Sequence, residues 1–431
     1  MTENKNNSDN KLKPEISSSN NSDIINDNNN NSIESDSSRY SIIQFKNIIQ
    51  SSTKDNYIRL IREMSNGYIL VLHNLNDISI YTKNLDYKGI IKFNSINNIE
   101  LTTKSNNNEN VINKNIFNII ETNYSINKKE ENFIQLMECS KEGLKIYNLE
   151  LNNIDKKDII SYLKLSCTGC FEIMNNYIIV GEKGIFHFEG LKVNDLEDYR
   201  IDELSIRGSI KINDNYIVVT SNSILPKGED ILCIYDSNIK KFIKTLEFSL
   251  VIEENGLNLM NVVEEGDQKD KENKRDKKLL LCACKKYNES QNNGILIIDT
   301  NNIGENQKLF YIFLSTDDFE VNCFCPLKIK KDNELLITNY FLVGGLDKEK
   351  RQGMIKLYKV QYNEKSNDKI NVEYLQDIII EADEKFKGFD KNIICMMQCQ
   401  SSGKILISSS DGNLYLFSRP NLDYYIEEYQ I

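Results

Sequence analysis

One short apolar pattern recurs seven times along the chain, and this repetition constrains the fold more than any other feature of the sequence. Each copy follows a turn residue, alternates aliphatic positions and ends in an aromatic or aliphatic side chain. The copies are residues 78–81, 144–147, 185–188, 232–235, 295–298, 355–358 and 414–417. Short runs of β-branched, aliphatic and aromatic residues favour the extended conformation. The pattern therefore predicts one β-strand that is repeated seven times.

Three further apolar runs accompany this strand in most copies and predict a four-stranded repeating unit. The preceding run is entered through Asn or Gly, which supply the positive φ of a tight turn, and covers 68–72, 177–181, 216–220, 340–344 and 404–408. An earlier run covers 57–61, 170–174, 208–212, 321–325 and 393–397, and a later one covers 89–93, 158–163, 242–246, 309–314 and 372–378. The inner runs are apolar on both faces, which fits radial blades better than the half-solvated strands of a β-sandwich. We therefore predict an all-β fold, a seven-bladed β-propeller with four antiparallel strands in each blade.

The two ends of the chain compete for one place in this ring. The last unit ends at Phe417 without an outer strand, and the first unit begins near Tyr57. The stretch 40–45 fits the missing strand, so we expect the N-terminal strand to close the ring and leave no open edge. The C-terminal stretch 424–431 is the alternative.

Polar stretches divide the chain into a tail and a propeller with inserted loops. Residues 1–37 are rich in Asn, Ser and Asp and have almost no large side chain to bury, so we expect a disordered tail. The propeller is expected to span 38–431, with polar loop insertions at 102–110, 123–132, 264–278 and 363–369. The last residues of consecutive copies lie 41 to 66 residues apart. Blade repeats typically have about 40 to 45 residues, and the insertions account for the additional length. The Ser-rich tail is either a docking or phosphorylation segment or a tract without a role of its own.

The charge balance argues against several classes of partner. The chain has 53 basic and 64 acidic residues and a net charge of -11, which disfavours nucleic acid and anionic lipid as partners. The basic cluster at 274–278 follows a run of acidic residues and is expected to be a solvated loop. No apolar run reaches the length of a membrane helix, and the N-terminal residues lack the apolar region of a signal peptide. We expect no membrane insertion and a cytoplasmic location, with the nucleus as an open alternative.

Three segments resemble the WD40-repeat superfamily of β-propellers: 230–236, 293–299 and 392–417. In the last of these, the turn Ser409-Ser-Asp-Gly-Asn413 followed by an apolar strand is similar to the family's Ser-x-Asp-Gly turn. The chain contains no Trp, so Tyr235-Asp236 and Ile298-Asp299 are the nearest substitutes for the Trp-Asp dipeptide. The family's Gly-His element is also missing. The resemblance implies a propeller that serves as an interaction platform.

Cysteine spacing raises one hypothesis of a metal or redox site. Cys167 and Cys170 have the spacing of a zinc half-site or a redox pair, but no second pair of ligands at similar spacing accompanies them. Two further pairs, Cys282 with Cys284 and Cys323 with Cys325, are two residues apart and point to one face of a strand. Buried free thiols are the favoured interpretation of all ten cysteines.

Other candidate groups for catalysis or binding are scattered along the sequence. The chain has two histidines, His73 and His187, and no nucleophile elbow or phosphate-binding loop accompanies them. The aspartates Asp214, Asp317, Asp318 and Asp411 lie in predicted turns, where Asp commonly bonds its own backbone. A paired-Arg motif for phosphoinositides finds only weak counterparts in Arg207-Gly208 and Arg351-Gln352-Gly353.

The sequence predicts a non-catalytic scaffold or adaptor. Loops at the two ends of the ring are expected to bind other proteins or peptides, because rigid strands position variable loops. We predict no enzyme activity, no cofactor, no metal site and no catalytic residue, and the sequence does not indicate which residues bind the partner. The alternatives are a propeller enzyme that uses acidic residues in the central channel and a metal-assisted protein that uses Cys167 and Cys170.

Overall fold

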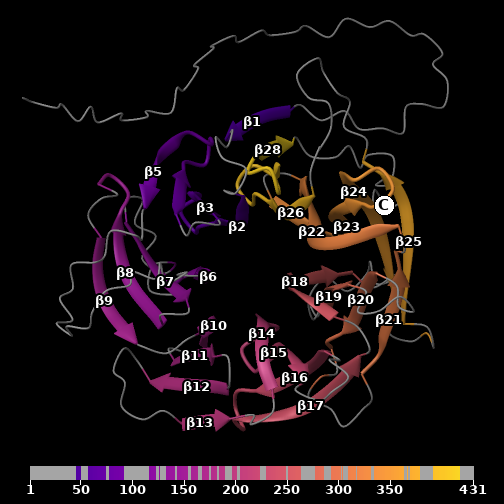
Figure 1. Cartoon of the computed structure of the whole chain (residues 1–431), viewed down its shortest axis with the longest axis horizontal. Helices are drawn as coiled ribbons and strands as arrows, with labels where there is room; N and C mark the ends of the chain where they lie inside the picture. The colour runs from indigo at the N-terminus through magenta and orange to yellow at the C-terminus, as the bar shows by residue number, and fades with distance from the viewer. Residues whose placement is uncertain are drawn as a thin grey trace, which may run out of the picture. The chain divides into compact units, whose positions relative to one another are not determined.

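The computed structural model describes residues 45–417 of the 431-residue chain, with gaps of which the longest are 92–115, 264–276 and 379–391. These residues all belong to the second of the two units into which the chain divides, Tyr40–Ile431. In this part of the chain, 28 strands form seven four-stranded antiparallel sheets. The sheets surround a central opening, and the innermost strands, which we call the first strands of the blades, are β2, β6, β10, β14, β18, β22 and β26 (Figure 1). No helix among the described residues is long and apolar enough to cross a membrane.

Six of the seven blades use consecutive strands, and we number the blades in chain order. Blade 1 has β2 (Ile58–Glu63), β3 (Ile69–His73), β4 (Ile78–Tyr81) and β5 (Tyr87–Ile91); blade 2 has β6 (Ile116–Glu121), β7 (Phe133–Ser140), β8 (Gly143–Glu150) and β9 (Lys157–Leu163). Blade 3 has β10 (Cys167–Ile173), β11 (Asn176–Gly181), β12 (Gly184–Glu189) and β13 (Glu197–Arg200); blade 4 has β14 (Leu204–Lys211), β15 (Tyr216–Ser223), β16 (Asp230–Asp236) and β17 (Lys241–Phe248). Blade 5 has β18 (Val251–Val262), β19 (Lys277–Lys285), β20 (Gly294–Asp299) and β21 (Tyr311–Ser315); blade 6 has β22 (Phe319–Lys331), β23 (Glu334–Asp347), β24 (Gln352–Tyr362) and β25 (Ile370–Asp377). Blade 7 combines β26 (Ile393–Gln398), β27 (Ile405–Ser409) and β28 (Leu414–Phe417) with β1 (Phe45–Ile49).

The seven recurring strands of the sequence pattern fall in the third strand of each blade, and the fold is the predicted seven-bladed β-propeller. The hydrophobic core lies between blades rather than within one of them. Seven core clusters of described residues each join two successive blades around the ring. Ile69 and Val71 of blade 1, for example, pack with Leu406 of blade 7. Each fully buried aliphatic or aromatic side chain contributes about 1.5 to 3 kcal/mol to this packing.

In β16, Tyr235 stands at the position where the family dipeptide would place Trp. Tyr235 at the end of β16 is 0% exposed, and its hydroxyl lies 2.5 Å from Nε2 of His187 in blade 3. The following Asp236 accepts hydrogen bonds from the backbone N–H groups of Asn238 (2.8 Å) and Ile239 (3.3 Å). The Tyr-Asp pair therefore joins two blades through its ring and closes a turn through its carboxylate.

The outer strand of blade 7 comes from the N-terminal side of the described chain. β1 runs antiparallel to β28, with Phe45 opposite Phe417 and Asn47 opposite Tyr415. The described strand shares only Phe45 with the predicted stretch 40–45 and continues to Ile49, beyond the predicted end. Residues 40–44 and the competing stretch 424–431 lie outside the described residues.

Several expected domain features fall in parts of the chain that the structure does not describe. These are the tail 1–37, the insertion 102–110 and all of 123–132 except Ile126. The insertion predicted at 264–278 is shorter at its end, because β19 already begins at Lys277 and takes in its last two residues. The insertion 363–369 connects β24 to β25, and its two ends meet through a hydrogen bond from Asn363 N–H to the Lys369 carbonyl (2.9 Å).

Candidate functional site

The Cys167 and Cys170 pair is buried in β10 and faces other sulfur and backbone atoms. Sγ of Cys167 lies 3.8 Å from the Ser140 carbonyl oxygen, and Sγ of Cys170 lies 3.7 Å from Sδ of Met137. Contact with these two thiols and burial raise the pKa of Cys139 well above its ordinary value, so this third thiol stays protonated. Within the described residues, no group of three or more His, Cys, Asp or Glu is arranged to hold a metal ion. The structure therefore gives no support to the zinc hypothesis.

The other paired cysteines pack in the core, as their spacing predicts. Cys282 and Cys284 belong to the cluster between blades 4 and 5, and Cys323 and Cys325 to the cluster between blades 6 and 7. Burial raises the pKa of the Cys325 thiol to about 12. A protonated, buried thiol is a poor nucleophile and a poor metal ligand.

The two histidines lie in separate blades and do not form a catalytic set. Nε2 of His73 is 2.8 Å from Oγ of Ser79, and burial lowers the pKa of this imidazole to about 4. His187 contacts the hydroxyl of Tyr235. Both interactions join neighbouring strands or blades and are structural.

Of the aspartates expected to bond the backbone of their own turn, Asp411 does so, whereas Asp318 is contacted from another turn. Asp411 accepts a hydrogen bond from the backbone N–H of Asn413 (3.0 Å) in the turn between β27 and β28, where Gly412 has a positive φ. Asp318 accepts through its backbone carbonyl from the N–H of Lys348 (2.9 Å), and Asp317 lies outside the described residues. Arg351 is exposed in the turn between β23 and β24, far along the chain from Arg207 in β14.

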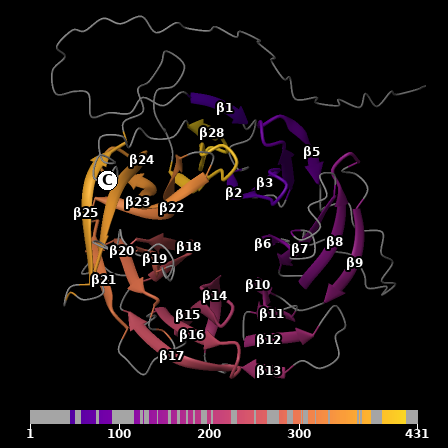
Figure 2. The ribbon, with the colours of Figure 1, turned by 180° about the vertical axis from the view of Figure 1, so that it is seen from behind.

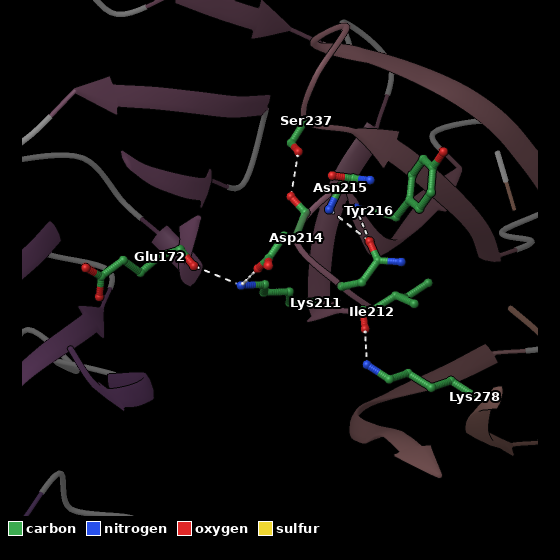
Figure 3. A network of polar contacts seen from close by, with 9 residues as sticks. Glu172, Lys211, Ile212, Asp214, Asn215, Tyr216, Ser237 and Lys278 are labelled. Atoms are coloured by element: carbon green, nitrogen blue, oxygen red, sulfur yellow. Dashed lines mark hydrogen bonds and ion pairs between the residues drawn. The ribbon is translucent and has the colours of Figure 1, made fainter. Parts of the chain in front are cut away.

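A network at the end of β14 shows how a charged turn joins three blades (Figure 3). Nζ of Lys211 lies 2.7 Å from Oδ1 of Asp214 and donates to the Glu172 carbonyl of blade 3 (2.9 Å). From blade 5, Nζ of Lys278 donates to the Ile212 carbonyl (3.0 Å). Within blade 4, the hydroxyl of Ser237 donates to the Asp214 carbonyl (3.0 Å). The turn after β14 is thus fixed from both sides.

The central channel is lined by residues from the first strands of all seven blades. It contains a cavity of about 660 Å³. Near its start, each innermost strand has an irregularity in its pairing with the next strand, which leaves one residue, or four in β18, out of register; β22 has a second shift between Pro326 and Lys328. The bulged positions are Arg59, Phe117, Thr168, Arg207, 253–256, Asn322 and Ile394. Bulges redirect side chains, and three of these residues, Arg59, Thr168 and Arg207, line the cavity.

The channel lining is basic. Among the described lining residues, the cations are Arg59, Arg62, Arg207 and Lys211, and Glu63 is the one carboxylate. The pair of convergent acidic groups that the enzyme alternative requires is therefore not present among these residues. The positive channel contrasts with the net charge of -11 of the whole chain.

A second hollow of about 610 Å³ lies where β2 and β6 end, and we call it the turn groove. Turn residues of blades 1 and 7 and the end of β6 line it. The carboxylate of Glu121 accepts hydrogen bonds from the N–H and hydroxyl of Ser65, both at 2.7 Å. The carboxylate of Glu63 accepts from the backbone N–H groups of Ser401 (3.0 Å) and Gln400. Blades 7, 1 and 2 are therefore fastened to one another around the groove.

The sequence reasoning missed Arg59 and Arg62 and left Arg207 as an isolated residue. The signal was present, because Ile58-Arg59 and Ile206-Arg207 are the same dipeptide at the same point of two first strands. Aligning the first strands of the blades, rather than the third, would have shown it. The turn groove had no such signal, since its residues come from turns far apart in the sequence.

Comparisons with known proteins identify the class of fold. No protein-family model and no curated protein matches the chain. Among 760 matching chains of solved structures, Raptor from Chaetomium thermophilum has a TM-score of 0.53 and 14% identity, over 89% of this chain and 30% of that one. The β-propeller domain of Cps50 (Swd1) from Myceliophteria thermophila has a TM-score of 0.50 and 9% identity, over 87% of this chain and 99% of that one. The chain shares the β-propeller fold of these structures, and it spans less than a third of the length of the Raptor chain.

Proposed function

We propose that the protein is a non-catalytic scaffold that binds a segment of a partner protein in the turn groove at one end of the ring. The observation that carries the proposal is the construction of the groove: turns of blades 7 and 1 and the end of β6 are held by the carboxylates of Glu63 and Glu121. A preorganised surface loses little conformational entropy when a partner binds. The volume of about 610 Å³ suits a short segment rather than a whole domain.

The lining of the turn groove suits a segment that combines an apolar anchor with an acidic group. Ile126 is 38% exposed and lines the groove, as do Ile120 and Met64. Lys83, between β4 and β5, is exposed at the same place. An apolar side chain of the partner can cover Ile126, and a carboxylate can pair with Lys83.

The experiment compares partners that are retained by the full chain and by two variants. We expect affinity purification with quantitative mass spectrometry to recover the same proteins with the wild type and with Ile239→Asp, and to lose them with Ile126→Asp. Ile239 is 56% exposed on the turn between β16 and β17 and does not line the groove, so it controls for an exposed Ile replaced by a charge. The loss should be at least about tenfold, which is the value of one anchoring side chain.

Direct binding of the purified partner completes the test. A partner that binds the wild type and Ile126→Asp equally in solution places the interface elsewhere on the ring. A chain that enriches no protein under several growth conditions contradicts the scaffold function itself. A fluorescent fusion of the full chain tests the proposed cytoplasmic location in the same cells.

A further inference from the structure

The described chain ends at Phe417, and this end lies on the same side of blade 7 as the turn groove. Phe417 pairs with Ile405, the first residue of β27. The turn 399–404 leads directly into β27 and supplies Gln400 and Ser401 to the groove. Neighbouring strands lie about 5 Å apart and four residues span at most about 14 Å, so Phe417 lies within roughly 20 Å of Ser401.

The strand that ends at Phe417 also stands next to blade 1, whose first turn forms another wall of the groove. Leu414 and Leu416 of β28 pack with Ile58 and Ile61 of β2. Both views place the strands of blade 7 beside those of blade 1 (Figure 2). The turn that follows β2 lines the groove. A segment that continues from Phe417 therefore begins beside the turn groove.

The outer place in blade 7 is already taken, so the chain after Phe417 is not needed to complete this blade. β1 holds the place, with Phe45 opposite Phe417. The stretch 424–431, the alternative candidate for it, has apolar or aromatic residues at 424–426, 429 and 431. Seven extended residues span at most about 25 Å, so the chain from 424 onward is long enough to reach the groove.

The residues that arrive there match the open parts of the groove lining. Residues 424–426 are Tyr-Tyr-Ile, and 427–428 are Glu-Glu. In the groove, Ile126 is 38% exposed, and Lys83 is exposed and forms no ion pair with a described residue. Lys83 lies along the turn after β2, because a Cβ placed on Gly67 would be 3.4 Å from its Cβ. An apolar and an acidic group thus stand next to each other in the segment, as an apolar and a basic group do in the groove.

The other charged groups of the lining are engaged within the protein. The carboxylate of Glu63 accepts hydrogen bonds from the turn of blade 7, and that of Glu121 accepts them from Ser65. The Nη2 atom of Arg62 donates to Oδ1 of Asn118 (3.1 Å). Lys83 is therefore the charged group of the groove that an acidic segment can pair with.

We propose that residues 424–428 occupy the turn groove of their own chain and compete there with the partner segment. The proposal rests on the turn groove as the binding site of the proposed function. Tyr or Ile of the segment covers Ile126, and Glu427 or Glu428 pairs with Lys83. A short linker gives a tethered segment an effective concentration on the order of millimolar, so a contact of modest affinity fills the groove. The partner then binds with an apparent affinity that is reduced by the occupied fraction.

The first test is zero-length cross-linking of the full chain with a water-soluble carbodiimide, which joins an amine to a carboxylate in direct contact. Mass spectrometry of the digested protein identifies the linked pairs. We expect a link from Glu427 or Glu428 to Lys83 that is at least about tenfold more abundant than the link to Lys88. Lys88 is an exposed lysine of β5 that does not line the groove. A mixture of isotope-labelled and unlabelled chains separates links within one chain from links between two copies.

Two variants test the apolar contact while leaving both linked groups in place. Ile126→Asp and Ile426→Asp should each reduce the Lys83 link by at least about tenfold, whereas Ile239→Asp should leave it unchanged. Circular dichroism establishes that each variant folds. Equal links to Lys83 and Lys88, or a Lys83 link unchanged in both folded groove variants, overturn the proposal. Links between two copies alone also overturn it, because the occupant is then a second copy.

The second test adds the segment as a separate molecule, a fluorescent synthetic peptide of residues 420–431. It should bind the full chain with Ile426→Asp at least about tenfold more tightly than the wild type, whose groove is filled. Equal affinities, or no binding to either chain, overturn the internal contact. If partners still depend on Ile126 while the Lys83 link is absent, the proposed function stands and the internal contact fails. A strong Lys83 link with partners that bind Ile126→Asp normally supports the internal contact and places the partner elsewhere.

Discussion

The imidazole of His73 lies at the end of β3 with 5% of its surface exposed and Nε2 2.8 Å from Oγ of Ser79. Burial lowers its pKa to about 4, from an ordinary value of 6.5. Between these two values the unfolded chain binds a proton that the folded chain does not bind. Stability from this residue is therefore complete above pH 6.5 and is lost as the pH falls towards about 4.

A substitution at His73 separates this effect from the acid sensitivity of the whole chain. We expect the wild type to lose about 2 kcal/mol more unfolding free energy than His73→Gln between pH 7 and pH 5, since each pH unit inside the window contributes about 1.4 kcal/mol. Gln keeps a hydrogen-bonding group near Ser79 but does not titrate. Urea unfolding of both proteins at the two pH values measures this difference. The carboxylates lose the same stability in both proteins as the pH falls, so their effect cancels in the comparison. Equal losses would show that His73 becomes protonated without unfolding.

At the scale of the strands, side chains bonded to backbone atoms fasten each blade to the next. Asn339 in β23 is 2% exposed, and its amide reaches the end of blade 5. Its Nδ2 donates to the Val263 carbonyl and its Oδ1 accepts from the Val263 N–H, both at 2.7 Å. The single amide group therefore replaces a pair of backbone hydrogen bonds that no strand supplies at this junction.

Removal of this amide should cost more than removal of an exposed one. Asn339→Ala leaves both backbone groups of Val263 without their partner, for an expected loss of about 2 kcal/mol. Asn371→Ala is the matched control, because the side chain of Asn371 is exposed and donates to the side chain of Gln361 (2.8 Å), and its loss should stay within about 0.5 kcal/mol. Urea midpoints of the three proteins measure the difference. Equal midpoints would mean that water or a rearranged turn satisfies Val263.

The strands that the sequence predicted and those that it missed differ in what surrounds them. The third strands were recognisable because they carry buried apolar residues at recurring positions, most completely in β20, where every residue is buried. The outer strand β13, with the sequence EDYR, has no apolar run, since its outer side faces away from other blades. In β18 the polar bulge 253–256 interrupts the apolar pattern. Arg59 and Arg207 were missed for the same reason, because a bulge places them out of the alternation that identifies a strand.

At the scale of the whole molecule, the ring consists of seven junctions that resemble one another in construction. Each has its own apolar cluster, and the first strands of neighbouring blades contact each other around the channel. In an open row of such units, the first and last would each expose one apolar face. Closure buries both faces, and the cluster that joins blades 7 and 1 contains Leu414 and Leu416 next to Ile58 and Ile61. The rigidity of the channel and the turn groove thus depends on the contact between the two ends of the propeller.

This dependence predicts a specific effect of shortening the chain at its N-terminal side. Deletion of residues 1–49 removes β1 and leaves β28 as an open edge, whereas deletion of 1–39 removes only the other unit of the chain. We expect the longer deletion to lower the thermal midpoint by roughly 5 °C or more relative to the shorter one, because a ladder of backbone hydrogen bonds is lost. An unpaired edge also pairs with other chains, so sedimentation should show self-association that increases with concentration. Identical melting and sedimentation of the two proteins would mean that the closure of the ring resides in the packing of blade 7 against blade 1, and that β1 only covers a seam that is already closed.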